Sequence, residues 1–188
     1  MKLYLLIIFA CMALIAAVVS FAFNINFFIV FGITVLATVL VILVDGITAG
    51  LMRLLPKKVA KHDAKIYTVS VKEKQFYEKL HIRDWKEKVP EIGHFTGFRK
   101  NKIADPKSIE YVERFLMEAC YGELGHFLSL FTGFLILLFQ PLSLLWLSVS
   151  IPVAAVNFIL NVPFVMILRY NCYKLEILLK SNQKRLKK

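Results

Sequence analysis

Residues 127–168 read FLSLFTGFLILLFQPLSLLWLSVSIPVAAVNFILNVPFVMIL and contain no charged side chain. A bilayer core takes about 20 helical residues per crossing, so this run is long enough for two crossings. Its polar pair Gln140-Pro141 is a suitable place for a turn between them. The run therefore predicts two membrane-spanning helices joined by a tight connection.

A second apolar block covers residues 3–44 and is interrupted only by Asn24 and Asn26. By the same length argument it predicts another pair of helices, with a turn at residues 23–26. The composition agrees, because 58% hydrophobic residues and a mean hydropathy of +0.63 exceed what a soluble domain normally carries. We expect an all-α, polytopic membrane protein with four transmembrane helices arranged as two hairpins.

The beginning of the chain also has features of a signal peptide, with Lys2, an apolar run and small residues at 16–17. A second apolar helix follows almost immediately, and the two would pair well. We therefore expect residues 3–22 to remain as the first helix of a hairpin rather than to be cleaved.

The distribution of basic residues predicts the orientation of the chain. Its 24 Lys and Arg outnumber 13 Asp and Glu, which gives a formal charge of +11, and neither predicted turn is charged. Lys and Arg are retained on the cytoplasmic side of membranes. We expect a multi-pass protein of the cell membrane with both termini and the central segment cytoplasmic. The positive charge is then explained by topology and membrane lipid, with no nucleic acid as a partner.

Three segments follow from this pattern. Residues 1–52 form an N-terminal transmembrane hairpin, and residues 53–105 form a basic interfacial or cytoplasmic helical segment. Residues 106–188 form a long helix that leads into the second transmembrane hairpin and a basic cytoplasmic tail.

The central segment carries its own helix signals. Ser70 and Glu73 have the spacing of a capping box, which predicts a short helix after Ser70. Asp105-Pro106 predicts the start of the next long helix, because Asp favours the N-cap and Pro the first turn. Residues 93–102 are expected to form a loop between these helices.

Residues 82–89 combine an aromatic side chain with several cations. Trp85 suits the headgroup depth of a membrane, with Arg83, Lys86 and Lys88 reaching toward polar groups. These features predict an interfacial helix. A small solvated cytoplasmic subdomain is an equally good interpretation of the same residues.

Ionisable residues enter the third apolar helix. Counting back about 20 residues from Gln140 places the start of the crossing near Tyr121. This draws Glu123 and His126 inside the cytoplasmic leaflet and leaves Glu118 at its surface. At about 100° per residue these side chains share one helix face with small residues. Since ionisable groups inside a membrane are costly and commonly functional, we expect a site here.

The fourth apolar helix adds polar groups at the same depth. Asn157 and Asn161 lie one turn apart, and Asn161 lies about 12 Å along the helix from Arg169, which Tyr170 and Asn171 follow. Two antiparallel helices with a tight turn would bring these groups to the level of the acidic residues and the histidine. The alternative is that the asparagines only hold helices together and that the arginine marks the interface.

The chemistry suggested by this cluster is proton transfer. His126 is suited to deprotonating a hydroxyl, with Glu123 orienting the imidazole and a nearby Asn or Arg stabilising an oxyanion. Glu118, Glu123 and His126 could instead hold a metal, but one histidine and no second ligand motif make this the weaker interpretation. We predict no metal. The sequence has no phosphate-binding loop and no nucleophile elbow.

Three separated blocks of these residues carry a family resemblance. They are Arg83-x-Trp85-Lys86-x-Lys88, then Glu118-x4-Glu123-Leu-x-His126-x-x-Ser129, then Asn161-Val-Pro163 with Arg169-Tyr170-Asn171-x-x-Lys174-Leu175. In this order, over about residues 76–188, the chain resembles the glycosyl-4,4'-diaponeurosporenoate acyltransferases of staphyloxanthin-type carotenoid biosynthesis.

The resemblance implies transfer of a fatty acyl group from an activated donor to a hydroxyl of a lipid or glycosylated isoprenoid. A sugar hydroxyl is the expected acceptor group. It implies an acyl-CoA or acyl-carrier-protein thioester as co-substrate and no bound cofactor. Together with the argument from the residues, it makes His126, Glu123 and Glu118 the predicted catalytic groups. The predicted substrate-binding residues are Asn161, Arg169, Tyr170, Asn171, Arg83, Trp85, Lys86 and Lys88.

Two other classes of protein fit parts of the pattern. In a non-enzymatic membrane scaffold or lipid-binding subunit, the same polar residues would hold helices together. A small membrane methyltransferase would have a similar helix count, but the sequence has no cofactor motif for it. Activity and folding of a His126→Ala variant would separate the enzyme from the scaffold.

Overall fold

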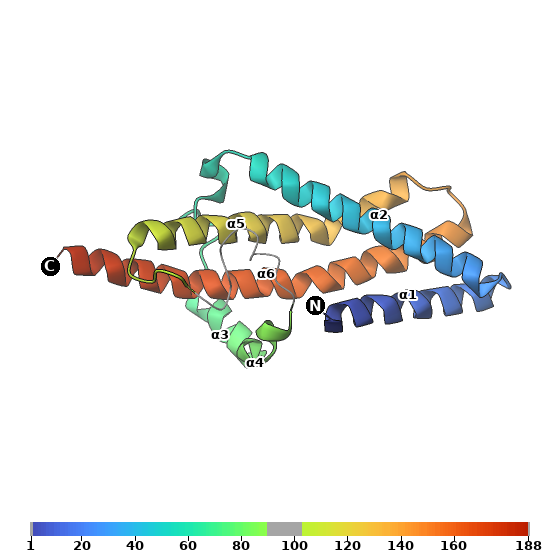
Figure 1. Ribbon diagram of the computed structural model, residues 1–188, viewed down its shortest axis with the longest axis horizontal. Coiled ribbons are helices and arrows are strands. Elements are labelled where there is room, and N and C mark those ends of the chain that lie inside the picture. The colour runs from blue at the N-terminus through green and yellow to red at the C-terminus, as the bar shows by residue number, and fades with distance from the viewer. Residues whose placement is uncertain (1, 90–102, 188) are drawn as a thin grey trace. The chain divides into compact units, whose positions relative to one another are not determined.

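The computed structural model describes residues 2–89 and 103–187, and the regular structure in those ranges is entirely helical (Figure 1). Four of its helices are long and apolar enough to cross a membrane. They are α1 (Lys2–Phe23), α2 (Phe27–Leu54), α5 (Ile109–Thr132) continued by the 3-10 helix η4 (Gly133–Leu138), and α6 (Leu144–Leu186). The prediction of an all-α chain with four membrane-length helices is confirmed.

Shorter elements connect α2 to α5. They are η1 (Lys57–Ala60), α3 (Val71–Lys79), α4 (Ile82–Trp85) and η2 (Lys86–Lys88). The loop predicted at residues 93–102 lies outside the described residues.

The chain divides into two compact units. The first unit comprises Met1–Leu51 and Gly125–Val162, and the second comprises Met52–Leu124 and Pro163–Lys188. The long helices α2, α5 and α6 therefore each contribute to both units.

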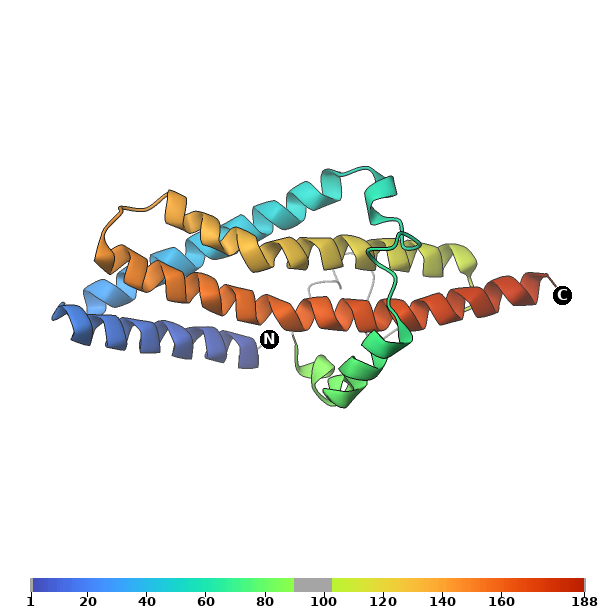
Figure 2. The same ribbon diagram turned by 180° about the vertical axis from the view of Figure 1, so that it is seen from behind.

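The first unit packs α1 and the beginning of α6 against α2 and η4. Both views place α1 beside the first part of α6 (Figure 1, Figure 2), and the Tyr4 hydroxyl donates to the Leu160 carbonyl oxygen at 3.0 Å. Asn24, in the left-handed conformation at φ 53°, and the side chain of Asn26 make the turn between α1 and α2. The buried apolar core consists of Ala16, Val19, Val30, Ala37, Val41, Ile136, Val149 and Val153.

The second unit is built on the seam between the first part of α5 and the last part of α6. Small and branched side chains fill this seam, namely Val112, Leu116, Ala119, Cys172, Leu175 and Leu179. The segment after α2 covers α5 through Ala60 and Tyr67, which pack against Cys120 and Tyr121. The Tyr121 hydroxyl, on α5, donates to the Leu55 carbonyl oxygen at 2.9 Å and so holds this segment against α5.

The helix starts test two sequence predictions. Ser70 caps α3 as predicted, because its hydroxyl accepts the Glu73 backbone N–H at 3.1 Å. The predicted start of α5 at Asp105-Pro106 is wrong, since α5 begins at Ile109. Ser108 takes the capping role by accepting the Tyr111 backbone N–H, whereas the Asp105 carboxylate accepts N–H groups of the preceding turn.

Helix α6 runs without interruption through Pro152 and Pro163 and continues to Leu186. The residues after the apolar run, beginning with Arg169, therefore lie inside the helix rather than beyond its end. Arg169 and Cys172 are three residues apart on this helix, so their side chains lie on the same side of it. Both residues belong to the second unit.

Candidate active site

His126 and Asn161 meet in the first unit. The imidazole Nδ1 of His126, on α5, lies 2.9 Å from the amide Oδ1 of Asn161, on α6. An amide oxygen only accepts hydrogen bonds, so Nδ1 carries the proton in this contact. In a neutral imidazole the basic lone pair is then on Nε2.

The orientation of the Asn161 amide is fixed by its other end. Its Nδ2 donates to Asp45 Oδ2 at 3.2 Å and to both the backbone and the side-chain oxygen of Asn157 at 3.1 Å. Because these partners are all oxygen acceptors, the amide nitrogen must face them and Oδ1 must face His126. The buried Asn161 thereby selects the imidazole tautomer.

Asp45, on α2, accepts hydrogen bonds from the side-chain amides of both Asn157 and Asn161. Its Oδ1 lies 3.4 Å from Asn157 Nδ2, which also donates to the Ser129 carbonyl oxygen at 3.0 Å. Gly133 makes room for this arrangement, since a Cβ there would lie 2.7 Å from Asn157 Nδ2. We call this group the His126 cluster, defined by His126, Asn161, Asn157, Asp45 and Ser129.

Sequence analysis missed Asp45. It is the one acidic residue before Arg53, and α2 continues from it to Leu54, so its carboxylate lies inside a membrane-length helix rather than at the end of one. The signal was available, because an ionisable residue in such a helix is a functional candidate. The predicted apolar block ends at Val44, one residue before Asp45, whereas α2 continues past it.

Arg169 organises a different cluster in the second unit. Its Nε and Nη2 donate to the two oxygens of Glu73 at 2.5 and 3.0 Å, which is a bidentate pair. Its Nη1 donates to Glu123 Oε1 at 2.5 Å and to the Ile66 carbonyl oxygen at 3.0 Å. Four of the five guanidinium N–H groups are thus engaged. We call Arg169, Glu73, Glu123, Ile66 and Tyr77 the Arg169 cluster.

The carboxylates of the Arg169 cluster are held differently. Burial raises the pKa of Glu73, but hydrogen bonds from Arg169 and Tyr77 and the Arg169 charge outweigh it, so the pKa lies below its ordinary value. Glu123 is only 5% exposed, and its second oxygen has no hydrogen-bond partner among the described residues. Glu123 therefore depends on Arg169 for compensation of its charge.

Two further predicted substrate-binding residues meet beside this cluster. Arg83 Nε donates to the hydroxyl of the fully buried Tyr170 at 2.8 Å, and its Nη2 donates to Glu78 at 2.5 Å. Lys174 Nζ lies 4.5 Å from the centre of the Tyr170 ring, within range of a cation–π contact. Arg83 keeps most of its side chain exposed, so it can face a soluble ligand.

The remaining predicted binding residues are spread more widely. Trp85 Nε1 donates to the Leu80 carbonyl oxygen at 2.9 Å, which holds the ring against the end of α3. Lys86 lies 3.9 Å from Glu87, Lys88 is exposed on η2, and Asn171 is half-buried on α6.

Glu118 forms an ion pair with Arg53 in the second unit, at 3.3 Å between Oε2 and Nη1. Within residues 2–89 and 103–187, no three His, Cys, Asp or Glu side chains are grouped so that they could hold a metal ion.

These observations define a helical protein with four membrane-length helices and a histidine whose tautomer is set by a buried amide and a carboxylate, a combination suited to proton transfer. The comparison with family models then identifies it more closely. Residues 61–181, or 121 of 188, match the glycosyl-4,4'-diaponeurosporenoate acyltransferase family, and the chain belongs to that family. The predicted resemblance is confirmed. No curated protein and no solved structure matches the chain.

The matched region contains both clusters except for one residue. His126, Ser129, Asn157 and Asn161 lie inside residues 61–181, whereas Asp45 lies before them. The N-terminal helices therefore contribute a carboxylate to the His126 cluster that the family match does not cover.

Proposed function

We propose that this protein is an integral membrane acyltransferase in which His126 is the general base. The observation that carries the proposal is the 2.9 Å contact between His126 Nδ1 and Asn161 Oδ1, in a chain of an acyltransferase family. The donor is an acyl-CoA or acyl-carrier-protein thioester. The acceptor is a hydroxyl of a lipid or glycosylated isoprenoid, and the family description supports a glycosylated carotenoid acid.

In the proposed reaction, Nε2 of His126 takes the proton of the acceptor hydroxyl as its oxygen attacks the thioester carbonyl carbon. A carbon–oxygen bond forms, the carbon–sulfur bond breaks, and the protonated imidazole returns the proton to the departing thiolate. The products are an ester and a free thiol. Asn161 keeps Nδ1 as the donor throughout, and Asp45 keeps Asn161 in place.

The Arg169 cluster has a supporting part in this proposal. It joins α6 to Glu73 on α3 and to Glu123 on α5, and few of its donors are left for a substrate. Arg83, Lys86 and Lys88 are better candidates to bind the phosphates of a CoA or carrier-protein donor, because Arg83 and Lys88 are exposed. Glu123 then orients Arg169 rather than the imidazole.

We further propose that the four long helices cross the cell membrane, with both termini cytoplasmic. Large apolar side chains are exposed on α1, for example Leu6 at 66% and Phe21 at 92%, as expected of surfaces in contact with lipid. Reporter fusions at Lys58 and Lys188 should both give cytoplasmic signals. A signal from the outer side of the membrane at either position would contradict this topology.

The central test is His126→Gln, which keeps a hydrogen-bonding side chain of similar size but has no group that accepts the proton. Turnover of the purified protein in detergent, measured with a labelled acyl thioester and a glycolipid acceptor, should fall by about 100-fold or more. Thermal stability should be retained. His81→Gln is the matched control, since His81 is an exposed histidine of the second unit.

Two results would refute the assignment. Substantial activity in His126→Gln would exclude this histidine as the base. Loss of folding in His126→Gln would instead favour the alternative class, a membrane scaffold whose polar residues hold helices together.

A further inference from the structure

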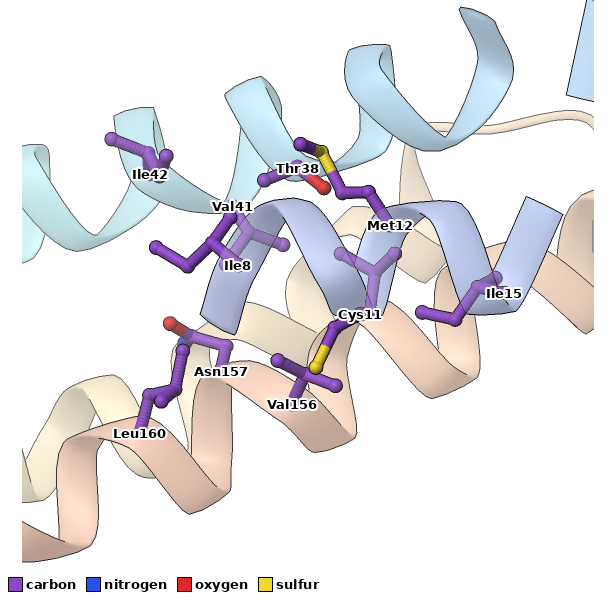
Figure 3. A pocket seen from close by; sticks show the side chains of 11 residues that line it. Ile8, Cys11, Met12, Ile15, Thr38, Val41, Ile42, Val156, Asn157 and Leu160 are labelled. Carbon is purple, nitrogen blue, oxygen red and sulfur yellow. The ribbon is translucent and has the colours of Figure 1, made fainter. Parts of the chain in front are cut away.

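The first unit contains an apolar cavity of about 50 Å³ between α1, α2 and α6 (Figure 3). Ile8 and Cys11 line it from α1, Val41 from α2, and Val156 and Asn157 from α6. Figure 3 shows these side chains converging on the same space from three helices. The proton-transfer step described above makes no use of this cavity.

The polar groups around the cavity are directed elsewhere. The Thr38 hydroxyl donates to the Thr34 carbonyl oxygen at 2.8 Å, so it is bound within its own helix. The amide nitrogen of Asn157 donates to Ser129 and Asp45, on the side of the His126 cluster. A water molecule needs two to four polar partners, and this lining supplies few. The cavity is therefore suited to an alkyl group.

The cavity is elongated along the helices. Its lining on α1 runs from Ile8 to Ile15, which is about 10 Å at the rise of an α-helix. Ile8 lies at the end shared with Asn157 and Leu160, and Ile15 lies at the opposite end (Figure 3). This shape fits a segment of one extended chain better than a compact ring system.

Asn157 connects the cavity to the chemistry. It belongs both to the wall of the cavity and to the His126 cluster, through its contacts with Asp45 and Asn161. An alkyl chain that lies in the cavity thus has one end beside the groups proposed to carry out acyl transfer. Binding sites of this kind are mostly apolar, with a few polar groups at the end that fixes the ligand.

We propose that this cavity binds the fatty acyl chain of the donor, with the thioester end toward Asn157 and the methyl end toward Ile15. The inference rests on the proposed function and adds the location of the acyl site and the residues that set chain length. Ile15 and Cys11 then determine which acyl lengths are accepted. Neither residue takes part in proton transfer.

The test compares octanoyl-CoA, whose extended chain matches the length of the cavity, with butanoyl-CoA as donors for purified variants. Cys11→Phe narrows the cavity, so kcat/KM for octanoyl-CoA should fall by at least about tenfold relative to butanoyl-CoA. Ile15→Ala opens the far end and should shift the ratio in the opposite direction. Leu14→Phe is the matched control, because Leu14 is 64% exposed on the same helix and does not line the cavity. Its ratio should stay unchanged.

A ratio that stays unchanged in both Cys11→Phe and Ile15→Ala, with activity retained, would overturn the acyl site while leaving the proposed function standing. Val156→Phe narrows the cavity from α6 and replaces Cys11→Phe if that variant does not fold. Failure of the proposed function has a different signature, since no variant or wild-type protein would then transfer an acyl group from either donor.

Photolabelling identifies the occupant directly. Octanoyl-CoA with a diazirine near its methyl end should label the wild-type protein near Ile15, and Cys11→Phe should lose this label. If a diazirine-bearing phosphatidylglycerol labels the same residues and excess octanoyl-CoA does not compete, the cavity holds a bilayer lipid chain and the proposal is wrong.

Discussion

The His126 cluster and the Arg169 cluster both place ionisable residues within membrane-length helices, but they neutralise them in different ways. Arg169 lies between two carboxylates and uses four of its five N–H groups. His126 is hydrogen-bonded to a neutral amide, that of Asn161, and the one carboxylate of its cluster, Asp45, is hydrogen-bonded to the same amide. The Arg169 cluster thus neutralises buried charges, whereas the His126 cluster determines which imidazole nitrogen carries the proton.

The difference separates stability from chemistry. A buried charge whose partners are removed is strongly destabilising, so the Arg169 cluster should govern folding of the second unit. An imidazole held by an amide can gain and lose a proton at its other nitrogen without breaking a salt bridge. The His126 cluster should therefore govern turnover, and variants of the two clusters should separate along these two measurements.

The largest expected effect is on stability, from Arg169→Met. This variant leaves Glu73 and Glu123 without their cation, and we expect a loss of about 3–5 kcal/mol in the free energy of unfolding. Chemical denaturation in detergent measures it. Lys180→Met is the matched control on the same helix, because Lys180 is 72% exposed and lies 3.8 Å from Glu176, and it should cost less than about 1 kcal/mol. Equal losses of unfolding free energy in Arg169→Met and Lys180→Met would contradict the view that the Arg169 cluster governs stability.

The same variant should change the pH dependence of stability. The folded-state pKa of Glu73 is below its ordinary value of 4.5, so its ion pair stabilises the fold above pH 4.5. That contribution is lost as the pH falls through the lowered pKa. Arg169→Met should weaken this acid sensitivity, and an unaltered slope of stability against pH below 4.5 would show that Glu73 is not held by Arg169.

The next effect is on turnover, from Asp45→Asn. An asparagine at this position has one acceptor oxygen for the two amides of Asn157 and Asn161, so one of them must turn away. We expect kcat to fall by about tenfold, with thermal stability nearly unchanged. The variant keeps the His126 imidazole but changes its orientation. Thr48→Val is the control on the same helix, since the Thr48 hydroxyl contacts the Val44 carbonyl oxygen and the Thr132 hydroxyl, neither of which belongs to the His126 cluster.

A double-mutant cycle distinguishes positioning from packing. If Asp45 acts through the imidazole, Asp45→Asn should have little further effect in a His126→Gln background. Additive losses of kcat would show that Asp45 affects activity by another route.

The long helices were predictable because their signal is local and strong. Residues 127–168 have no charge, and a short polar turn divides them, so length alone gives two helices. The start of α5 was misplaced because Asp105 and Ser108 both favour caps, and local propensity does not say which one the helix uses. The continuation of α6 to Leu186 required the seam with α5, which is a tertiary contact.

The site was predictable only in part. Helical spacing placed His126 and Asn161 at one depth, and the structure brings them together. Spacing also favoured Glu123 as the partner of His126, since three residues separate them, but the Glu123 carboxylate contacts Arg169. The Asp45 contact joins residues 116 positions apart, and no local period encodes such a pairing.

The smallest expected effect concerns how the Arg169 cluster is positioned. Ser70 begins α3, and its hydroxyl accepts the backbone N–H of Glu73, the residue that pairs with Arg169. Ser70→Ala removes this cap and should cost about 1 kcal/mol of stability. Turnover should stay the same, because Ser70 belongs to the second unit and the His126 cluster belongs to the first.

Ser70→Gly sharpens this last comparison. Glycine is tolerated at the N-cap and should cost only a few tenths of a kcal/mol, so stability should rank wild type, Ser70→Gly, Ser70→Ala. Combining Ser70→Ala with Arg169→Met should give less than the sum of the two losses, because the cap positions a carboxylate that no longer has its cation. A fully additive pair would show that the cap stabilises α3 alone and has no part in holding Glu73 against Arg169.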